Sequence, residues 1–375
     1  MYLADLVLSD FRSHQDVSVK FEPGVNILVG GNGQGKTNLV EAVVFLATLA
    51  SHRVALNAAL VRTGAERARV QAKLIRDGRA ATAEVVISPG KGTAAKLGTS
   101  KVKPSALLGL TRVAAFAPED LTLVKGTPAG RRRYLDEAIT QLKPSMAGVF
   151  ADYDKVVSQR TALLKTIRAE RLTAAAGSLE GELEIWDQQV AALGGRITAQ
   201  RMKLAEDLAP LVAAAYAELA GGSQAKMTYQ PVVELPAGAT PADVAEALLA
   251  AMVAGRREEV ARGVSLFGPH REDLELELGE LPARGYASHG ESWSLALALK
   301  LGAFHLMRAE SRDDPILILD DVFAELDTSR RQALATVAKD VEQVIVTAAV
   351  EQDVPPDLGG LRFQVTQGQV TPWNR

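Results

Sequence analysis

Short alternations of apolar and polar residues, separated by turns, fill roughly the first third of the chain and predict strands. Strand-like segments lie at residues 3–8 and 17–21. A mostly apolar run at 25–29, directly after Gly24 and interrupted only by Asn26, is typical of a buried strand. From Gly35 the apolar period changes to that of a helix. Two further strands are expected at residues 69–75 and 83–87.

The middle of the chain has the spacing of long helices. Apolar residues recur at heptad-compatible intervals over 150–167, and a second set runs over 179–208 and stops at Pro210. Gly177 would end the first helix and Ser178 would cap the second. Two helices of about 30 residues would form an antiparallel arm roughly 45 Å long. A plain helical bundle is the alternative.

The last part of the chain returns to strands. Residues 273–278 alternate strictly, 292–307 form an amphipathic pattern, and 315–319 and 344–347 are apolar runs of the buried-strand type. The sequence therefore predicts an α/β fold interrupted by a helical insertion.

Composition excludes several classes of protein. The chain has 375 residues, 47% apolar and 23% charged, values that suit a globular protein with a sizeable core. The absence of cysteine excludes disulfide-stapled folds, thiolate metal sites and cysteine nucleophiles. The first ten residues do not resemble a signal peptide, and no apolar stretch is long enough to span a bilayer. We therefore expect a cytoplasmic protein with no membrane partner.

Charge is unevenly distributed, although the net charge is only -3. Residues 51–103 carry 11 Lys/Arg against 3 acids, whereas residues 304–375 carry 7 against 12. The basic block could contact a phosphate backbone, and a solvated face of strands explains it equally well. On charge alone the DNA-contact candidates are Arg53, Arg62, Lys73 and Arg79.

Residues 30–37 match the phosphate-loop pattern G-x-x-x-x-G-K-[ST] between a predicted strand and a predicted helix. In such a loop backbone N–H groups wrap a phosphate, the lysine reaches the β- and γ-phosphates, and the hydroxyl ligates Mg²⁺. We expect Lys36 and Thr37 to take these roles, with ATP and Mg²⁺ as the cofactors. The expected nucleotide-binding residues here are Gly30, Gly31, Asn32, Gly33, Gln34, Gly35, Lys36, Thr37 and Asn38.

A buried apolar strand at 315–319 ends in Asp320 and Asp321. This pattern places one carboxylate beside the metal and another beside the attacking water of a P-loop NTPase. We expect Asp320 to hold Mg²⁺ and Asp321 to polarise the water.

Two further segments indicate the class of NTPase. Ser288-His289-Gly290-Glu291 opens a predicted helix and resembles the signature motif of ABC-type ATPases. Residues 324–327, which end in Asp327, resemble the D-loop of those proteins. We therefore predict an ABC-type head split in sequence. Its N-terminal half is 1–130, the arm domain is 131–265 and the C-terminal half is 266–375.

Seven segments, in order along nearly the whole chain, resemble the RecF family of recombination mediators, which is related to SMC heads. They are DFRSH at 10–14, GVNILVG at 24–30, GKTNLVEA at 35–42, FAPEDL at 116–121, RRRYLD at 131–136, GPHRED at 268–273 and LDDVFAELD at 319–327. The resemblance implies an ATP-gated homodimer that binds double-stranded DNA and single-strand/double-strand junctions. It would act with RecR and RecO to load RecA in gap repair, replication restart and the SOS response, in the nucleoid.

The resemblance also implies residue roles. Arg12 would contact an ATP phosphate, and Glu119 would lie near the metal and the attacking water. Ser288 and Gly290 would act on the nucleotide of the other subunit. Glu291 stands where ABC-type motifs usually carry Gln, so we do not assign it to the nucleotide.

Two other departures bear on turnover. Thr347 occupies the switch position where transporter ATPases carry His, and Asp321 is one methylene shorter than the usual Glu. We therefore expect a slow ATPase that times a clamp; a kcat above about 10 s⁻¹ would contradict this.

Three alternatives are weaker. A transporter subunit is disfavoured because positions 37 and 288 are 251 residues apart, and a small-molecule kinase would not need Ser288 and Gly290. An SMC-like chromosome organiser is the nearest alternative, but the arm is short and no hinge domain is evident. Of the other residues, His270 is predicted to be a structural or interface residue, and Trp186 and Trp293 are predicted to be packing residues. The Arg131–Arg133 cluster reads as a DNA contact, a helix cap or a partner for carboxylates.

Overall fold

Two compact units make up the chain in the computed structural model, which describes residues 1–375 except 52, 55, 171–178, 222–223, 312 and 374–375. Unit 1 comprises Met1–Lys125, Pro210–Ala225 and Leu278–Arg375, and unit 2 comprises Gly126–Ala209 and Lys226–Glu277. The expected turn at Gly177 and Ser178 lies outside the described residues.

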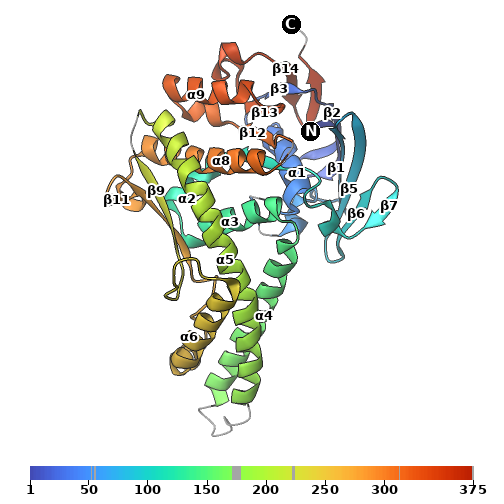
Figure 1. Cartoon of the computed structure of the whole chain (residues 1–375). Coiled ribbons are helices and arrows are strands. Elements are labelled where there is room, and N and C mark those ends of the chain that lie inside the picture. The colour runs from blue at the N-terminus through green and yellow to red at the C-terminus, as the bar shows by residue number, and fades with distance from the viewer. Residues whose placement is uncertain (52, 55, 171–178, 222–223, 312, 374–375) are drawn as a thin grey trace. The chain divides into compact units, whose positions relative to one another are not determined.

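Unit 1 contains two six-stranded sheets (Figure 1). The first has the order β2-β1-β4-β5-β6-β7 and is antiparallel. The second has the order β15-β14-β3-β13-β12-β8 and is parallel except for its edge strand β15. The strands of the first sheet are β1 (Tyr2–Phe11), β2 (His14–Lys20), β4 (Ala68–Arg76), β5 (Arg79–Ser88), β6 (Gly92–Leu97) and β7 (Ser100–Val102). Those of the second are β3 (Gly24–Val29), β8 (Val113–Phe116), β12 (Ile316–Asp320), β13 (Gln343–Ala348), β14 (Leu361–Thr366) and β15 (Gln369–Pro372).

The parallel sheet confirms the three buried strands expected from apolar runs. Every residue of β12 and β13 is buried, as a strand covered on both faces requires. The register pairs Asp320 with Thr347, and Thr347 with Leu28 near the end of β3. The carboxyl ends of β3, β13 and β12 therefore meet at one edge, the usual place for a ligand in an open α/β sheet.

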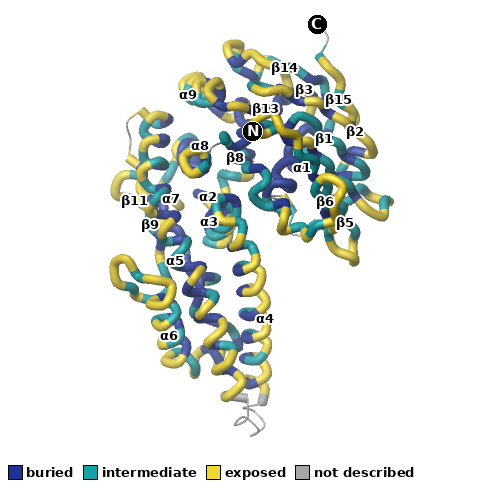
Figure 2. Tube along the Cα trace, turned by 45° about the vertical axis from the view of Figure 1, so that its right-hand side comes forward, coloured by how far each residue is buried: buried dark blue, intermediate teal, exposed yellow. Residues whose placement is uncertain are grey.

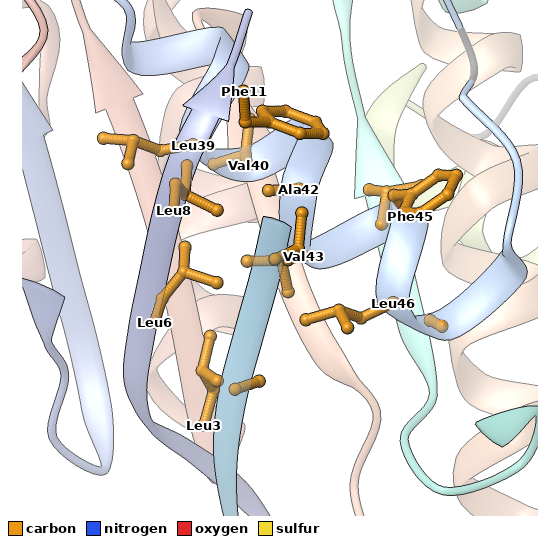
Figure 3. Packing of buried hydrophobic residues seen from close by; sticks show 14 of the residues in the cluster. Leu3, Leu6, Leu8, Phe11, Leu39, Val40, Ala42, Val43, Phe45 and Leu46 are labelled. Carbon is orange, nitrogen blue, oxygen red and sulfur yellow. The ribbon is translucent and has the colours of Figure 1, made fainter. Parts of the chain in front are cut away.

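Helix α1 (Lys36–Thr48) packs against the antiparallel sheet. Figure 3 shows side chains of α1, among them Leu39 and Val43, beside Leu6 and Leu8 of β1. Leu6, Leu8 and Leu39 have no exposed surface. Since each such side chain contributes about 1.5–3 kcal/mol on burial, this contact fixes the start of α1, where the phosphate loop ends.

The remaining helices of unit 1 are α2 (Leu121–Lys125), α7 (Ala283–Tyr286), α8 (His289–Glu310), α9 (Thr328–Lys339) and the end of α5 (Leu179–Leu219). The strand β11 (Leu281–Pro282) also lies in this unit. In the described part of the chain no helix is long and apolar enough to cross a membrane.

The expectation that the second long helix ends at Pro210 is wrong, because α5 continues through it. A proline inside a helix costs about 3 kcal/mol. The turns that follow bury Val212, Tyr216 and Leu219. Val212 lies so close to Gly302 of α8 that a Cβ built at Gly302 would be 2.7 Å from the Val212 side chain. Three such buried side chains outweigh the cost of the proline.

Unit 2 contains α3 (Pro128–Leu142), α4 (Met146–Glu170), the first part of α5, and α6 (Pro241–Arg262). It also holds most of β9 (Ala225–Gln230) and β10 (Asp273–Leu278), which confirms the strictly alternating strand. Two long helices are present as expected. However, α6 packs on α4 as a third helix, so these helices do not form a simple two-helix arm (Figure 1). Figure 2 shows the buried inner and exposed outer sides of α4.

A buried arginine explains the third helix. Arg160 of α4 has no exposed surface and donates to Asp187 of α5 (2.7 Å) and to both carboxylate oxygens of Glu259 of α6 (3.0 and 2.6 Å). A buried guanidinium is tolerated only when its donors are paired. Two acids from two different helices meet that need, and the three helices pack together around them.

Arg160→Ala is expected to lower the free energy of unfolding by about 3–5 kcal/mol, because it leaves the buried Glu259 without its cation and Asp187 with Arg256 alone. Urea denaturation measures the effect. The matched control is Arg196→Ala on the exposed side of α5, which should stay within about 0.5 kcal/mol of wild type. Equal stability of the two variants would contradict the account.

Candidate nucleotide-binding site

The phosphate loop, residues 30–37, joins β3 to α1 in a backbone form that only glycine adopts easily. Gly33 and Gly35 have φ of 79° and 107°, in the left-handed region. Gly30 passes so close to β14 that a Cβ would lie 2.2 Å from the carbonyl oxygen of Val365. Gly31 and Asn32 are exposed at the open side of the loop. The loop is therefore backed by the sheet and open to a ligand.

His14 and the turn between β14 and β15 hold this loop in place. The buried His14 ring bridges the carbonyl oxygens of Gly368 (2.7 Å) and Gly35 (3.0 Å). The Gln34 side chain accepts a hydrogen bond from the Gln367 backbone N–H (2.6 Å). The amide oxygen of this expected nucleotide-binding residue is therefore already bonded within the protein. Sequence reasoning did not assign His14 a role, and only its burial in the structure reveals one.

Lys36 is buried at the mouth of the loop, with 3% of its side chain exposed. Its Nζ donates to the carbonyl oxygen of Gly30 (2.7 Å) and lies 3.8 Å from Oδ2 of Asp321. The ammonium is thus held between the phosphate loop and the acidic end of β12. This arrangement suits recognition of a phosphate that enters between them.

Three side chains and the backbone N–H of Asp321 meet where β12 and β13 end. Thr347 Oγ1 donates to Oδ1 of Asp320 (2.6 Å) and accepts from the backbone N–H of Asp321 (2.9 Å). Thr37 Oγ1 donates to the same Asp320 oxygen (3.3 Å). The phosphate loop, the acidic pair and Thr347 therefore form one hydrogen-bonded cluster.

The cluster fits a magnesium ion held together with a nucleotide. Mg²⁺ prefers oxygen donors and is usually held by one or two protein oxygens plus substrate phosphates. Thr37 and Asp320 offer such oxygens, and no group of three or more acidic or histidine residues forms a separate cage among the described residues. Bound there, the ion would neutralise phosphate charge.

Burial raises the pKa of Asp320 to about 6, although the hydrogen bond from Thr347 lowers this pKa. The charges of Asp321 and Glu119 raise it further, and the bond from Thr37 lowers it. Above about pH 6 the folded protein therefore holds a buried carboxylate that a cation would stabilise.

This pKa predicts a pH-dependent effect of Asp320→Asn. Because the folded pKa lies above the ordinary 3.8, the folded state binds the proton more tightly, and this contribution to stability is lost as the pH rises from 3.8 through 6. Without nucleotide or Mg²⁺, the variant should be more stable than wild type at pH 7.5, by at most roughly 3 kcal/mol, and similar to it at pH 4. Calorimetry at both pH values measures this. A difference of equal size at both would contradict the account.

Asp321 is strained in a way that suits a reactive group. It adopts φ 52°, the left-handed region, directly after β12. Its Oδ1 is buried, and among the described atoms it finds no hydrogen-bond partner. A carboxylate oxygen without a donor beside Lys36 can accept a proton or orient a water molecule.

Arg12 lies at the site but is engaged by Glu41 of α1. Its Nε and Nη2 donate to the two Glu41 oxygens at 2.8 and 2.7 Å. Glu41 has no exposed surface, and burial alone would raise its pKa, but Arg12, Ser51 and Arg53 together hold that pKa below its ordinary value. Sequence reasoning missed Glu41. An acid within the buried apolar stripe of α1 is the signal that could have found it.

Arg53 lies at this site, whereas charge alone made it a DNA-contact candidate. Its guanidinium is 3.7 Å from Glu41 and 3.6 Å from Glu119, and it donates to Oδ1 of Asn38 (3.2 Å). Glu119 is half-exposed and close enough to raise the pKa of Asp320. The Asn38 side chain donates in turn to Ser13 (2.8 Å). The structure thus places Glu119, Asn38 and Arg53 together beside the phosphate loop.

The signature-like turn, residues 288–291, starts α8 and is exposed. The Ser288 hydroxyl accepts from the Glu291 backbone N–H (3.3 Å), and Glu291 accepts from the Ser288 backbone N–H (2.8 Å). This is a capping box. Asp327 similarly caps α9 by accepting from the backbone N–H of Arg330 (3.0 Å). Both helix starts therefore have a regular geometry at the surface of unit 1.

Comparison with known proteins identifies the family. The model of the RecF/RecN/SMC N terminal domain matches residues 2–355. The DNA replication and repair protein RecF of Streptomyces avermitilis is 50% identical over 373 residues, which cover 99% of each chain. The same protein of Frankia alni is 50% identical over 378 residues, again 99% of each. The chain belongs to the RecF family.

Solved structures agree with this assignment. The structure of the recombination mediator protein RecF with ATP, in the RecFOR pathway, is 27% identical with a TM-score of 0.90, covering 100% of this chain and 98% of that chain. An Smc head bound to the C-winged helix domain of ScpA is 16% identical with a TM-score of 0.56, and covers 100% and 98%. It shares the fold. The predicted ABC-type, SMC-like ATPase head is confirmed.

The capping box explains one departure of this RecF-family chain from the ABC-type pattern. The hydrogen bonds from Ser288 hold the pKa of Glu291 below its ordinary value, so its carboxylate is charged and occupied at its own helix start. A negative charge near a helix N-terminus is also favourable. The capping of α8 therefore accounts for a glutamate at position 291 without any contact with a phosphate.

Several basic residues outside the site are paired. Arg62 lies 2.7 Å from Asp10, and Lys73 lies 3.8 Å from Asp5 on β1. Arg79 begins β5 and is exposed. Surface pairs of this kind are worth at most about 1 kcal/mol, so they leave these side chains available to other partners.

The three arginines at 131–133 in unit 2 bond to carboxylates and to a backbone carbonyl. Arg131 is buried and donates to both oxygens of Asp273 (2.8 and 2.7 Å), and Arg133 pairs with Glu137. Arg132 donates to a backbone carbonyl (2.7 Å). Of the three interpretations of this cluster, pairing with carboxylates is the one the structure favours.

The histidine and tryptophans singled out in the sequence are structural. The His270 ring nitrogen Nδ1 shares a hydrogen bond with the Tyr153 hydroxyl (2.7 Å), and burial lowers the pKa of His270 to about 4. Trp293 is buried and donates to His289 (3.1 Å). Trp186 is only half-buried, so it lies at the edge of the helical packing, whereas its position on the apolar stripe predicts the core.

Proposed function

We propose that this chain is an ATP-dependent, DNA-binding recombination mediator whose dimerisation is gated by ATP. The observation that carries the proposal is the full-length similarity to RecF with ATP, at a TM-score of 0.90, together with a complete phosphate loop and acidic pair in one hydrogen-bonded cluster. The family assignment supports ATP binding and an ATPase reaction.

In this proposal the cis site binds and hydrolyses the nucleotide. The backbone of the phosphate loop and Lys36 bind the phosphates. Thr37 and Asp320 hold Mg²⁺, whose charge offsets that of the phosphates. Asp321, with its unpaired oxygen, orients the water and accepts its proton.

Arg12 and Glu119 flank this site. Arg12 is the residue proposed to contact a phosphate, and to do so it must give up part of its pairing with Glu41. Glu119, half-exposed beside Arg53, lies near the position of the water and the metal. When Arg12 leaves, Glu41 keeps its interactions with Arg53 and Ser51. The release of Arg12 therefore costs less than breaking an isolated buried ion pair.

The other face of the site comes from a second copy of the chain. Ser288, Gly290 and Asp327 start two helices at the surface of unit 1, and we propose that they meet the nucleotide bound by the other copy. Helix N-termini carry partial positive charge and free N–H groups, which suit a γ-phosphate. ATP would then join two heads, and hydrolysis would release them.

The proposed partners are double-stranded DNA, junctions between single and double strands, and the mediators RecR and RecO, with RecA loaded downstream. The roles are gap repair, replication restart and the SOS response, in the cytoplasm at the nucleoid. We also propose slow turnover, as suits a timed clamp, and the head–arm–head division at residues 130 and 265, in which the helices of unit 2 form the arm.

A second candidate function is that of an SMC-like chromosome-organising ATPase. The shared fold with Smc heads, at a TM-score of 0.56, is the observation that favours it. The two functions differ in DNA preference, since a mediator should favour a gapped duplex over an intact one.

Fluorescence anisotropy with labelled DNA tests the proposal. We expect ATP to tighten binding to a gapped duplex more than binding to an intact duplex or to a single strand, and Lys36→Met to remove the ATP effect. Binding of ATP with no effect on any DNA would contradict the proposal. Equal tightening on gapped and intact duplexes would favour the chromosome organiser.

A further inference from the structure

Arg330 lies between the two helix starts that the proposed function assigns to the second copy's nucleotide. It occupies the first turn of α9, and its Nη1 donates to Oδ2 of Asp327 (2.7 Å). On its other side is the signature-like turn, where the atoms nearest to a Cβ built at Gly290 are Nη1, Nη2 and Cζ of Arg330, at 3.3, 3.5 and 3.8 Å. One guanidinium thus bonds to Asp327 and lies beside Gly290.

The contact with Gly290 gives a reason for the glycine. Glycine inside a helix costs about 0.5–1 kcal/mol relative to alanine, so its presence needs an explanation. Gly290 does not adopt a positive φ, so the backbone does not demand it. A Cβ at 3.3 Å from Nη1 is tighter than ordinary van der Waals contact, and the guanidinium would have to move. A Cβ at position 290 would therefore displace the guanidinium of Arg330 by a few tenths of an ångström.

The guanidinium is only partly compensated where it lies. It sits in the first turn of its own helix and beside the first turn of α8, and a cation near a helix N-terminus is unfavourable. Asp327 offsets part of this charge, and Glu291 is near enough for Arg330 to lower its pKa, after the larger effect of Ser288. Asp327 and Glu291 therefore compensate the charge of Arg330, whereas its buried Nε has no hydrogen-bond acceptor among the described residues.

We propose that Arg330 is a positioning residue that holds the first turn of α8 and the D-loop-like segment, residues 324–327, in one fixed arrangement. Ser288 and Asp327 can then meet the nucleotide of a second copy together, and Gly290 is glycine to admit the guanidinium. The inference rests on the proposed function, because it concerns the face that acts on the other copy. It predicts a defect in dimerisation without a defect in the cis site.

Two readouts separate these effects. Binding of a fluorescent ATP analogue to dilute protein reports the cis site, and light scattering with ATP reports dimerisation. Arg330→Ala should weaken ATP-dependent dimerisation about 10-fold, as expected for loss of a charge-assisted hydrogen bond, and leave analogue binding within about 2-fold. Arg330→Lys keeps the charge but not the planar fork, so it should rescue only part of the loss. The matched control is Lys339→Ala, an exposed cation at the end of the same helix.

A double-mutant cycle tests the reason for the glycine. Gly290→Ala should weaken dimerisation about 10-fold in wild type and clearly less in Arg330→Ala, because the part of its effect that acts through Arg330 is gone and only the part from its own place at the partner's nucleotide remains. Additive losses would overturn the inference, as would normal dimerisation of Arg330→Ala or equal loss of both readouts. If the wild type binds the analogue but stays monomeric with ATP, the proposed function is the claim that fails.

Discussion

Lys36→Met is expected to abolish the effect of ATP on this protein. Methionine has a similar length but no charge, so the substitution removes the ammonium that lies between the phosphate loop and Asp321. Loss of one partner from a buried charge pair with phosphate costs about 2–5 kcal/mol, which corresponds to a loss of about 30-fold or more in nucleotide affinity. Binding of a fluorescent ATP analogue measures this loss, and light scattering shows whether dimerisation disappears with it.

The matched control is Lys339→Met, which removes an exposed lysine from the same unit. Its nucleotide affinity and its dimerisation should equal those of wild type. A thermal scan of both variants without nucleotide checks that each is folded. Wild-type affinity in a folded Lys36→Met would contradict the assignment of the phosphate loop.

Asp321→Asn is expected to stop hydrolysis while leaving ATP binding intact. The amide has nearly the same shape and still accepts one hydrogen bond, but it cannot take a proton from water. Loss of a general base costs about 10²–10⁴-fold in rate. Phosphate release under single-turnover conditions measures this, and the ATP-bound dimer should live longer in the same samples.

Asp340→Asn, an exposed aspartate just beyond α9, is the control and should hydrolyse ATP at the wild-type rate. A variant of Asp321 that keeps the wild-type rate would move the base to another residue, and Glu119 would be the next to test. A variant that also loses ATP binding would show that Asp321 supports the loop and not the reaction.

The strands that carry the site could be predicted because burial on both faces leaves a clear pattern. Residues 316–319 of β12 and 344–346 of β13 are apolar without interruption, β3 is interrupted only by the buried Asn26, and the polar residues Asp320 and Thr347 mark the edge where the site lies. The phosphate loop could be predicted for a similar reason. Its glycines are dictated by local backbone geometry, as the positive φ of Gly33 and Gly35 shows.

The end of α5 and the position of α6 could not be predicted, because both depend on contacts between distant segments. Pro210 reads as a helix end until Val212 is seen against Gly302. The partners of Arg160 come from residues 27 and 99 positions away. Local patterns carry no information on such pairings, which decide the fold through burial and charge.

The surroundings of the site divide in the same way. Motifs identified Lys36, Thr37 and Asp320, whose roles follow from residue type and spacing. Glu41 and His14 were not predicted, because both act on neighbouring groups: Glu41 holds Arg12, and His14 holds the loop carbonyl of Gly35. Such supporting residues are recognised by their burial and partners, which the sequence does not display.

Light scattering of the wild-type protein on a gapped duplex, with and without ATP, tests the central claim most directly. The account predicts that ATP doubles the protein mass on each DNA molecule, from one chain of 39.9 kDa to two, and that removal of ATP reverses the change. A single chain per DNA at saturating ATP, in protein shown to bind the nucleotide, would contradict the ATP-gated dimer.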